Sequence, residues 1–320
     1  MSLGRINFLS HAVESSLFRN GKVGLKRDRD GSDAAVMGVD KSVHDIEVID
    51  GRALNGRERK TCEFNGFELV TTPMADTSLD FFDHQTVVTR YYEECERLVS
   101  QFTGGRALAF DHNVRSARGK SSQQRIAGGQ AVQGPAKIVH GDYTLHSGPA
   151  RLRDLARPPG ANDTLRSLLP SGMGLIDDSM VTEALSEGGR FAIINVWRNI
   201  SDLPVQVNPM ALCDAQSVDP DDLVTFEIHY QDRVGENYFA KHNPAQRFYF
   251  FPEMTRAEAL LLKQWDSAGP LARSKGQVAD ASDANAPCTF SFHSAFDELS
   301  VAPDAPDRLS IEVRCLVLYR

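Results

Sequence analysis

The C-terminal two-thirds of the chain consists of short segments rich in β-branched and aromatic residues, and this pattern constrains the fold most. Proline, glycine, asparagine and aspartate separate them, and the segments are AKIVHGDYT, RFAIINVWRNI, LVTFEIHY, QRFYFFPEM, CTFSFHSAF and LSIEVRCLVLY. Segments of this length and composition are typical of β-strands. Many short strands with few helical segments between them predict a mainly β (α+β) fold, a sandwich or jelly-roll barrel with helices outside it.

Three segments predict helices. Apolar residues recur three and four positions apart over 83–102, and Gly104-Gly105 ends that segment. A second, short helix is predicted around 178–187. A third is predicted to begin at Thr255, because Thr255 and Glu258 have the spacing of a capping box and an apolar run follows them.

The N-terminal region differs from the rest in composition. Residues 20–60 are rich in glycine, aspartate and basic residues, which predicts irregular structure or edge strands. We expect an N-terminal extension (1–65) on a main domain (66–320), the two forming one compact unit. The DRDGSD stretch (28–33) resembles a calcium loop, but its spacing departs from an EF-hand, so a solvated turn is the better interpretation. Residues 116–134 lack periodicity and predict a surface loop or lid.

Charge and cysteine content exclude several classes of protein. The formal net charge of -8 argues against nucleic acid as the main partner, because phosphate binding needs a surplus of basic residues. No run of about 18 apolar residues is present, and the polar N-terminus lacks the apolar stretch of a signal peptide, so we expect no membrane partner. The 5 cysteines are scattered and form no CxxC pair, which favours reduced thiols. These features predict a cytoplasmic protein.

The segment IVHGDY contains two of the donors that a metal site requires. His140 and Asp142 are two residues apart in a predicted strand, so their side chains project from one face with Cα atoms about 7 Å apart. An imidazole nitrogen and a carboxylate oxygen are two of the three donors in the facial triad of non-haem iron(II) oxygenases. The third donor would be a histidine from a neighbouring strand, and the candidates are His112, His146, His229, His242 and His293.

His293 is favoured because of what surrounds it. It lies in the strand-like CTFSFHSAF, and Arg308-Leu309-Ser310 follows 15 residues later. Arg308 and Ser310 share a face of the last strand, so a guanidinium and a hydroxyl could bind one carboxylate. A 2-oxo acid that chelates a metal needs such a clamp for its far carboxylate. Each pattern alone is weak, because a lone HxD is more often a surface pair and a lone histidine is more often a core residue. The order of HxD, a distant strand histidine and RxS is much more specific for such a site.

Several segments together resemble a known family. They are VHGDYT (139–144), FAIINVWRNI (191–200), NPMALCD (208–214), the block 235–267, FSFHSAF (290–296) and RLSIEVRCLVLY (308–319). The chain from about residue 65 onward resembles the CmcJ/NvfI/AsaB-like hydroxylase/desaturase family of non-haem iron(II), 2-oxoglutarate-dependent dioxygenases. This resemblance implies a double-stranded β-helix (jelly-roll, cupin-like) core that uses Fe(II), 2-oxoglutarate and O2. It also implies hydroxylation or desaturation of a small, natural-product-like molecule in secondary metabolism, with release of succinate and CO2.

Position by position, the resemblance implies His140, Asp142 and His293 as metal ligands and Arg308 and Ser310 as the 2-oxoglutarate clamp. HSAF stands here in place of the family's HTAF. Further candidates come from the strands themselves. Arg314 shares the face of Arg308 and competes as carboxylate anchor, and Arg198 could bind 2-oxoglutarate or be an exposed strand-end charge. The substrate pocket could include Tyr143, Trp197 and Phe292, although aromatic strand residues usually serve packing.

Two other functions use the same residues. An accessory β-helix subunit could bind a small molecule or a partner enzyme and depend on that enzyme for turnover. A zinc hydrolase could use the same three ligands, but it has no role for the Arg308–Ser310 clamp. The N-terminal region, which matches no known pattern, could cover the opening of the barrel in a second copy of the chain, so a homodimer is an open alternative.

Overall fold

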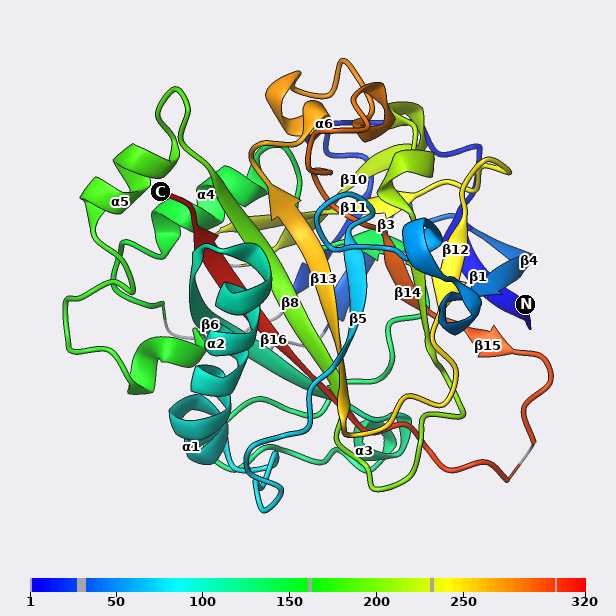
Figure 1. Ribbon diagram of the computed structural model, residues 1–320. Helices are drawn as coiled ribbons and strands as arrows, with labels where there is room; N and C mark the ends of the chain where they lie inside the picture. The colour runs from blue at the N-terminus through cyan, green and yellow to red at the C-terminus, as the bar shows by residue number, and fades with distance from the viewer. Residues whose placement is uncertain (1, 28–32, 161–162, 231–232, 303) are drawn as a thin grey trace.

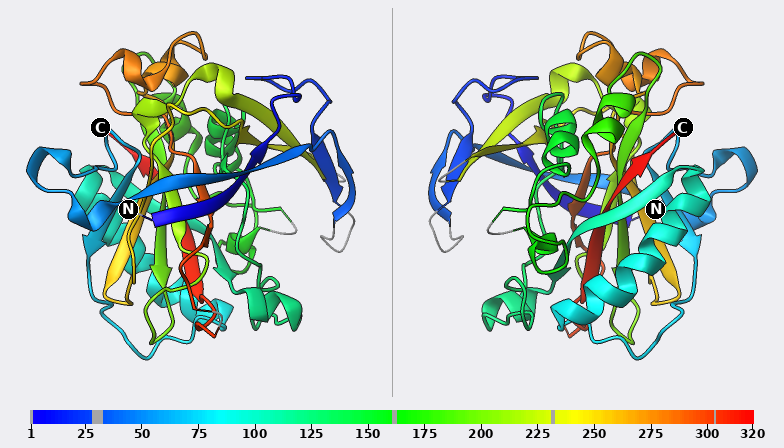
Figure 2. Two further views of the ribbon diagram at one scale, coloured as in Figure 1. Left: turned by 90° about the vertical axis from the view of Figure 1, so that its right-hand side faces the viewer. Right: turned by 90° about the vertical axis from the view of Figure 1, so that its left-hand side faces the viewer.

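The protein consists of two β-sheets that face each other, with helices on the outer side of the smaller one (Figure 1). The computed structural model describes residues 2–27, 33–160, 163–230, 233–302 and 304–320. The DRDGSD segment falls almost entirely on residues 28–32, which lie outside the described residues. The mainly β fold with a double-stranded β-helix (jelly-roll) core is confirmed, since the larger sheet curls around the smaller one (Figure 2).

Within the described residues the smaller sheet has five strands. In sheet order they are β5 (Phe67–Thr71), β13 (Glu258–Asp266), β8 (Phe191–Asn199), β16 (Ser310–Leu318) and β6 (Arg106–Arg115). Every neighbouring pair in it is antiparallel. Antiparallel partners place directly opposed residues on the same face, so the register defines which side chains share the inner face.

The larger sheet has eleven strands in the described part of the chain. Their order is β15 (Asp297–Glu298), β1 (Ser2–Leu9), β4 (Lys41–Asp50), β12 (Phe248–Phe250), β9 (Met210–Cys213), β14 (His293–Ala295), β7 (His140–Gly141), β11 (Val234–Ala240), β10 (Leu223–His229), β2 (Gly24–Arg27) and β3 (Asp33–Met37). Strands β2 and β3 lie at the edge, as the composition predicts. Strands β1 and β4 instead lie inside the sheet, so the division at residues 65 and 66 stays a prediction.

Helix α2 (Tyr92–Thr103) packs on the outer face of the smaller sheet, across β6, β16 and β8 (Figure 2). It continues α1 (His84–Thr86) through a π-helical turn at Val87–Tyr91 and ends at Gly104, whose φ is 70°. This helix and α5 (Asp178–Ala184) confirm two predictions. The remaining α-helices of the described ranges are α3 (Ala117–Ser121), α4 (Ser147–Asp154) and α6 (Pro270–Arg273). None of the described helices combines the length and apolarity needed to span a bilayer.

The third predicted helix is wrong, because the segment after Thr255 forms strand β13. The expected capping contact does form, since the Thr255 amide donates to Glu258 Oε2 at 3.0 Å, but the chain then extends. From position 259 to the end of β13 every residue is buried, between β5 and β8. A strand inside a sheet buries both faces, so its apolar run mimics a helix in sequence, and tertiary pairing overrides the local preference.

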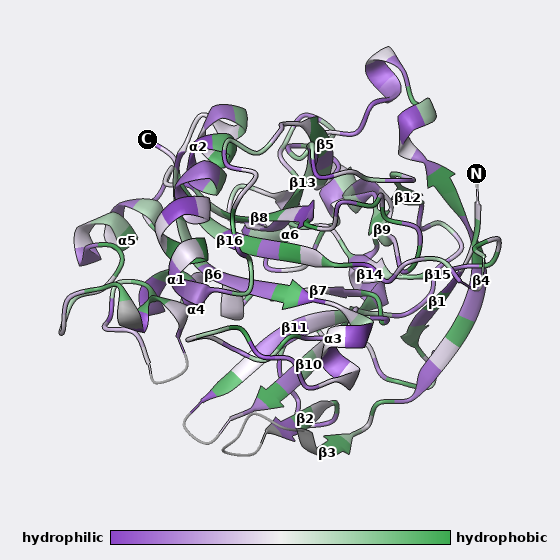
Figure 3. Cartoon of the chain, turned by 90° about the horizontal axis from the view of Figure 1, so that it is seen from below, coloured by the Kyte–Doolittle hydropathy of each residue, from purple (hydrophilic) through white to green (hydrophobic). Residues whose placement is uncertain are grey.

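The space between the sheets is divided into an apolar and a polar part. Trp197, Leu212, Tyr249, Leu260 and Leu262 belong to one buried cluster that joins the two inner faces. Beyond Trp197 the inner face of the smaller sheet becomes polar, and hydrophilic residues alternate with hydrophobic ones in the first half of strand β16 (Figure 3). Because this polar patch is enclosed between the two sheets, it can bind a charged group away from bulk water.

Candidate metal centre

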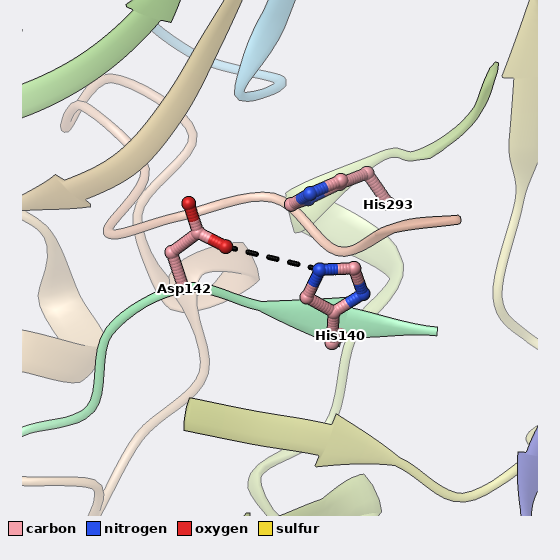
Figure 4. A group of neighbouring side chains, drawn as sticks. All are labelled: His140, Asp142 and His293. Atoms are coloured by element: carbon pink, nitrogen blue, oxygen red, sulfur yellow. Dashed lines mark ion pairs between the residues drawn. The ribbon is translucent and has the colours of Figure 1, made fainter. Parts of the chain in front are cut away.

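His140, Asp142 and His293 come together between the sheets, on the inner face of the larger one (Figure 4). His293 on β14 pairs directly with His140 on β7, and the two ring centroids lie 4.3 Å apart. One nitrogen of each histidine and one carboxylate oxygen of Asp142 lie within 4.8 Å of one another. The structure therefore brings His140 of β7 and Asp142, which directly follows β7, together with His293, 151 positions after Asp142, as the sequence predicts.

Gly141 lets the two ligands of β7 face inward. A Cβ atom at this position would lie 2.8 Å from the Phe290 ring, which is closer than van der Waals contact allows. The ring thus packs against the back of β7 while His140 and Asp142 occupy its front. Any larger residue between the two would push β7 off the aromatic core behind it.

His140 is held in the tautomer that suits a metal ligand. Its Nδ1 lies 2.8 Å from the carbonyl oxygen of Ile138, which can only accept, so Nδ1 carries the proton. Nε2 is left with a free lone pair, 3.8 Å from Asp142 Oδ1. Burial, together with the neighbouring His293, lowers the pKa of His140 to about 4, so the ring is neutral at pH 7. Burial likewise lowers the pKa of His293.

Asp142 supplies the negative charge of the site. Burial by itself would raise its pKa, but Arg314 and the two histidines outweigh burial and hold the pKa well below its usual range. Two neutral imidazoles and one carboxylate form the donor set of a non-haem iron(II) facial triad, with further coordination positions left for other ligands. The residues present therefore fit iron(II).

Arg308 is a buried cation that makes no direct ion pair with a described carboxylate. Its side chain is 2% exposed, lies over the Trp197 ring at 5.6 Å and donates from Nη1 to the carbonyl oxygen of Asn208. Its Nε has no hydrogen-bond partner, and nor has the buried hydroxyl of Ser310. No carboxylate of the described residues forms an ion pair with Arg308, and burial lowers its pKa to about 9. A guanidinium Nε and a hydroxyl that are both buried without a hydrogen-bond partner fit a ligand that carries a carboxylate.

Arg314 differs from Arg308 because acidic groups surround it. Its Nη1 lies 3.0 Å from Asp111 Oδ2, its Nε 3.3 Å from Asp142 Oδ2 and its Nη2 3.4 Å from Glu312 Oε1. Arg314 therefore already has three carboxylate partners, whereas Arg308 forms no ion pair with a described carboxylate. This difference favours Arg308 over Arg314 as the anchor for a ligand carboxylate.

Arg198 lies on the other face of the sheet. Its Nε donates to the Tyr91 hydroxyl, its Nη2 contacts Glu94 of α2, and its Nη1 donates to two backbone carbonyl oxygens. Neighbouring residues of a strand point to opposite faces, so Trp197 faces the site and Arg198 faces the helix. Arg198 therefore joins sheet to helix and has no access to the polar patch, contrary to what its position at the strand end suggested.

The three aromatic pocket candidates divide in the same way. Trp197 lies on the inner face beside Arg308, with an Nε1 that makes no hydrogen bond. Tyr143 is buried in the helix-side core, and burial raises its pKa to about 12. Phe292 belongs to the core of the larger sheet and packs edge-to-face on Phe290. Of the three, Trp197 is in position to touch a ligand near Arg308.

Sequence reasoning missed four polar residues of this site. Glu312 lies between Ser310 and Arg314 on the same face of β16, so the period of two that selected its neighbours also indicates it. Asp111, Arg115 and Gln264 depend on register or on a bulge, and no local pattern reveals them. Arg115 pairs with Ser310 across β6 and β16, and Gln264 is the extra residue of a bulge in β13. Gln264 Oε1 accepts from the Asp142 amide at 3.1 Å.

Comparisons with known proteins place the chain among oxidoreductases. It is 41% identical over 196 residues (61% of this chain, 89% of the other) to an uncharacterized protein in the dcmA 3′ region of Methylophilus leisingeri. It is 27% identical over 334 residues (98% and 94%) to the hydroxylase/desaturase efuI of Hormonema carpetanum.

Among solved structures, the iron and alpha-ketoglutarate-dependent endoperoxidase NvfI superposes with a TM-score of 0.71 at 20% identity, covering 99% of this chain and 97% of NvfI. At this identity the likeness establishes the fold, and it confirms the jelly roll. The resemblance found in the sequence is confirmed by the names of these relatives. The chain belongs to the family described as "YDMC: Oxidoreductase/YMDC permease-like domain", whose model matches residues 13–170 and 171–318.

Proposed function

We propose that this protein is an iron(II)- and 2-oxoglutarate-dependent dioxygenase that hydroxylates or desaturates a small molecule. The observation that carries the proposal is the cluster of His140, Asp142 and His293 on the larger sheet, together with the buried guanidinium of Arg308, just before β16, whose Nε has no hydrogen-bond partner. The relatives named as a hydroxylase/desaturase and as an iron and alpha-ketoglutarate-dependent enzyme support it.

Each residue has a role that its surroundings favour. His140, Asp142 and His293 would hold the metal through neutral nitrogens and one carboxylate oxygen. Bound iron(II) would supply the redox chemistry by which O2 converts 2-oxoglutarate to succinate and CO2 and oxidises the substrate. Arg308 and Ser310 would bind the far carboxylate of 2-oxoglutarate. This carboxylate would form the direct ion pair that the buried guanidinium lacks. The aromatic and aliphatic cluster around Trp197 would keep water out.

The test is reconstitution of the full chain. Anaerobic addition of iron(II) and 2-oxoglutarate should produce a visible charge-transfer absorption band that neither component produces alone. Admission of O2 should then release succinate, detected by mass spectrometry, across a panel of amino acids, polyketides and terpenoids. Absence of both the band and the succinate would end the proposal. A zinc hydrolase would show neither signal, whereas an accessory subunit would show the band without succinate.

Replacing Arg308 with methionine should have opposite effects on ligand affinity and on stability. Loss of two charge-assisted hydrogen bonds should raise the Kd for 2-oxoglutarate about 100-fold, from roughly 3 kcal/mol of lost interaction. The unliganded protein should melt at a higher temperature, because the variant removes a buried cation whose burial outweighs the attraction of the nearby Glu312 and Asp307. Calorimetric titration of the iron-loaded protein and thermal melting of the apoprotein measure the two effects.

A Ser310→Ala variant is the matched comparison for Arg308→Met. It removes one hydroxyl donor and should raise the same Kd about 10-fold. If the Arg308→Met protein bound 2-oxoglutarate as tightly as the wild type, this arginine would not be the anchor.

The substrate class follows from the relatives more than from the site. We infer a natural-product-like small molecule, because relatives of this chain are named as a hydroxylase/desaturase and an endoperoxidase. The cytoplasmic location and the homodimer stay predictions from the sequence.

A further inference from the structure

We infer that Arg314 and Asn195 are positioning residues that hold one oxygen of Asp142 so that its other oxygen is directed to the metal. The inference rests on the proposed function, since it takes Asp142 as a ligand. It assigns to Arg314 a role different from the carboxylate anchor that its place on β16 suggests, and it gives Asn195 a role in the site.

The two carboxylate oxygens of Asp142 have different surroundings. Oδ2 accepts from Asn195 Nδ2 at 3.1 Å and lies 3.3 Å from Arg314 Nε. Oδ1 faces His140 Nε2 at 3.8 Å, where an ion between the two would lie. A carboxylate with one oxygen engaged by two donors presents the other as a single ligand atom, which suits a facial triad with open positions.

Asp142 needs such support because its own strand is short. Strand β7 has two residues, His140 and Gly141, and Asp142 follows its end. Asn195 and Arg314, in contrast, lie on β8 and β16, where they are directly paired in the register of the opposite sheet. The smaller sheet therefore holds the Asp142 side chain at two points, and the hydrogen bond from the Asp142 amide to Gln264 of the same sheet adds a third.

Arg314 is itself fixed from two further sides. Asp111 on β6 holds its Nη1 at 3.0 Å, and Glu312 on its own strand lies 3.4 Å from its Nη2. The guanidinium plane is thereby set by groups other than Asp142, so its Nε direction is determined before any metal binds. The two arginines thus differ in role: Arg308, which precedes β16, is open to a bound carboxylate, whereas Arg314 of β16 supports the metal ligand Asp142.

Cobalt(II) is the probe for the test, because its visible absorption reports the number and arrangement of its ligands. The variants are Asn195→Ala, Arg314→Met and Arg314→Lys in the full chain. Outer-shell partners typically account for 10- to 100-fold in metal affinity, so Asn195→Ala should weaken cobalt binding about 10-fold and alter its absorption spectrum. Arg314→Met should weaken it more than Arg314→Lys does, because lysine keeps a donor and the charge. Competition with a chelating dye gives the affinities, and circular dichroism checks folding.

His146→Ala is the control, since the structure pairs this histidine with Glu236 and leaves its side chain 56% exposed; its cobalt affinity and spectrum should match the wild type. Asn195→Ala keeps the test decisive if Arg314→Met fails to fold, because it removes one hydrogen bond and no charge. Wild-type affinity and spectrum in a folded Asn195→Ala protein would overturn the inference. If neither the wild-type protein nor His140→Ala bound cobalt, the proposed metal centre itself would be overturned.

Discussion

Replacing His293 with alanine should lower the affinity for iron(II) by more than about 100-fold and abolish succinate release. The loss should exceed the 10- to 100-fold effect of outer-shell partners, since a direct donor is removed. His140 and Asp142 alone would leave two ligands on one short strand, with nothing from β14 to complete the set. Anaerobic metal titration, followed by oxygen consumption with 2-oxoglutarate, measures both effects.

His146→Ala is a matched control for His293→Ala. This histidine is closer in sequence to the HxD pair and is one of the five candidates for the third donor, yet the structure places its Nδ1 3.0 Å from Glu236 Oε1, with the side chain 56% exposed. Its removal should leave metal affinity unchanged. Equal losses in the two variants would mean that the effect is general and that β14 does not supply the third ligand.

Part of the cluster of His140, Asp142 and His293 was predictable because strand residues two positions apart have side chains on the same face. Residues two apart in a strand share a face, which pairs His140 with Asp142 and Ser310 with Glu312 and Arg314. Spacing along a strand does not show which face of the sheet is inside, nor which groups an arginine on that face contacts. Arg198 and Arg314 both lie on central strands, but one faces a helix and the other a carboxylate cluster. The difference depends on how the layers stack, which the local sequence does not encode.

Strand β13 shows a second limit of local reasoning. Its first residues satisfy a helix-capping pattern, and its apolar run is compatible with a buried helix or a buried strand. Pairing with β5 and β8, which lie far away in sequence, decides between them. The same pairing introduces the bulge at Gln264, so the residue that accepts from the Asp142 amide could not be identified before the register was known.

Replacing Lys263 with methionine should destabilise the protein by about 3–5 kcal/mol, the range for breaking a buried ion pair by removing one partner. Lys263 and Asp266 are both fully buried, and Lys263 Nζ lies 2.9 Å from Asp266 Oδ2. The same nitrogen donates to the backbone carbonyl oxygen of Glu63 at 3.0 Å, which ties β13 to the segment before β5. Methionine fills the volume but leaves Asp266 with Arg190 as its remaining charged partner.

Urea unfolding followed by circular dichroism measures the effect, and Glu63→Gln is the control. The Glu63 side chain is 40% exposed and its carboxylate lies 3.5 Å from Lys263, so its loss should change stability by less than about 1 kcal/mol. A Lys263→Met protein as stable as Glu63→Gln would show that Arg190 alone compensates Asp266. Because Gln264 follows Lys263 in the bulge, the folded fraction of Lys263→Met should also bind cobalt more weakly, which would link the buried ion pair of β13 to the position of Asp142.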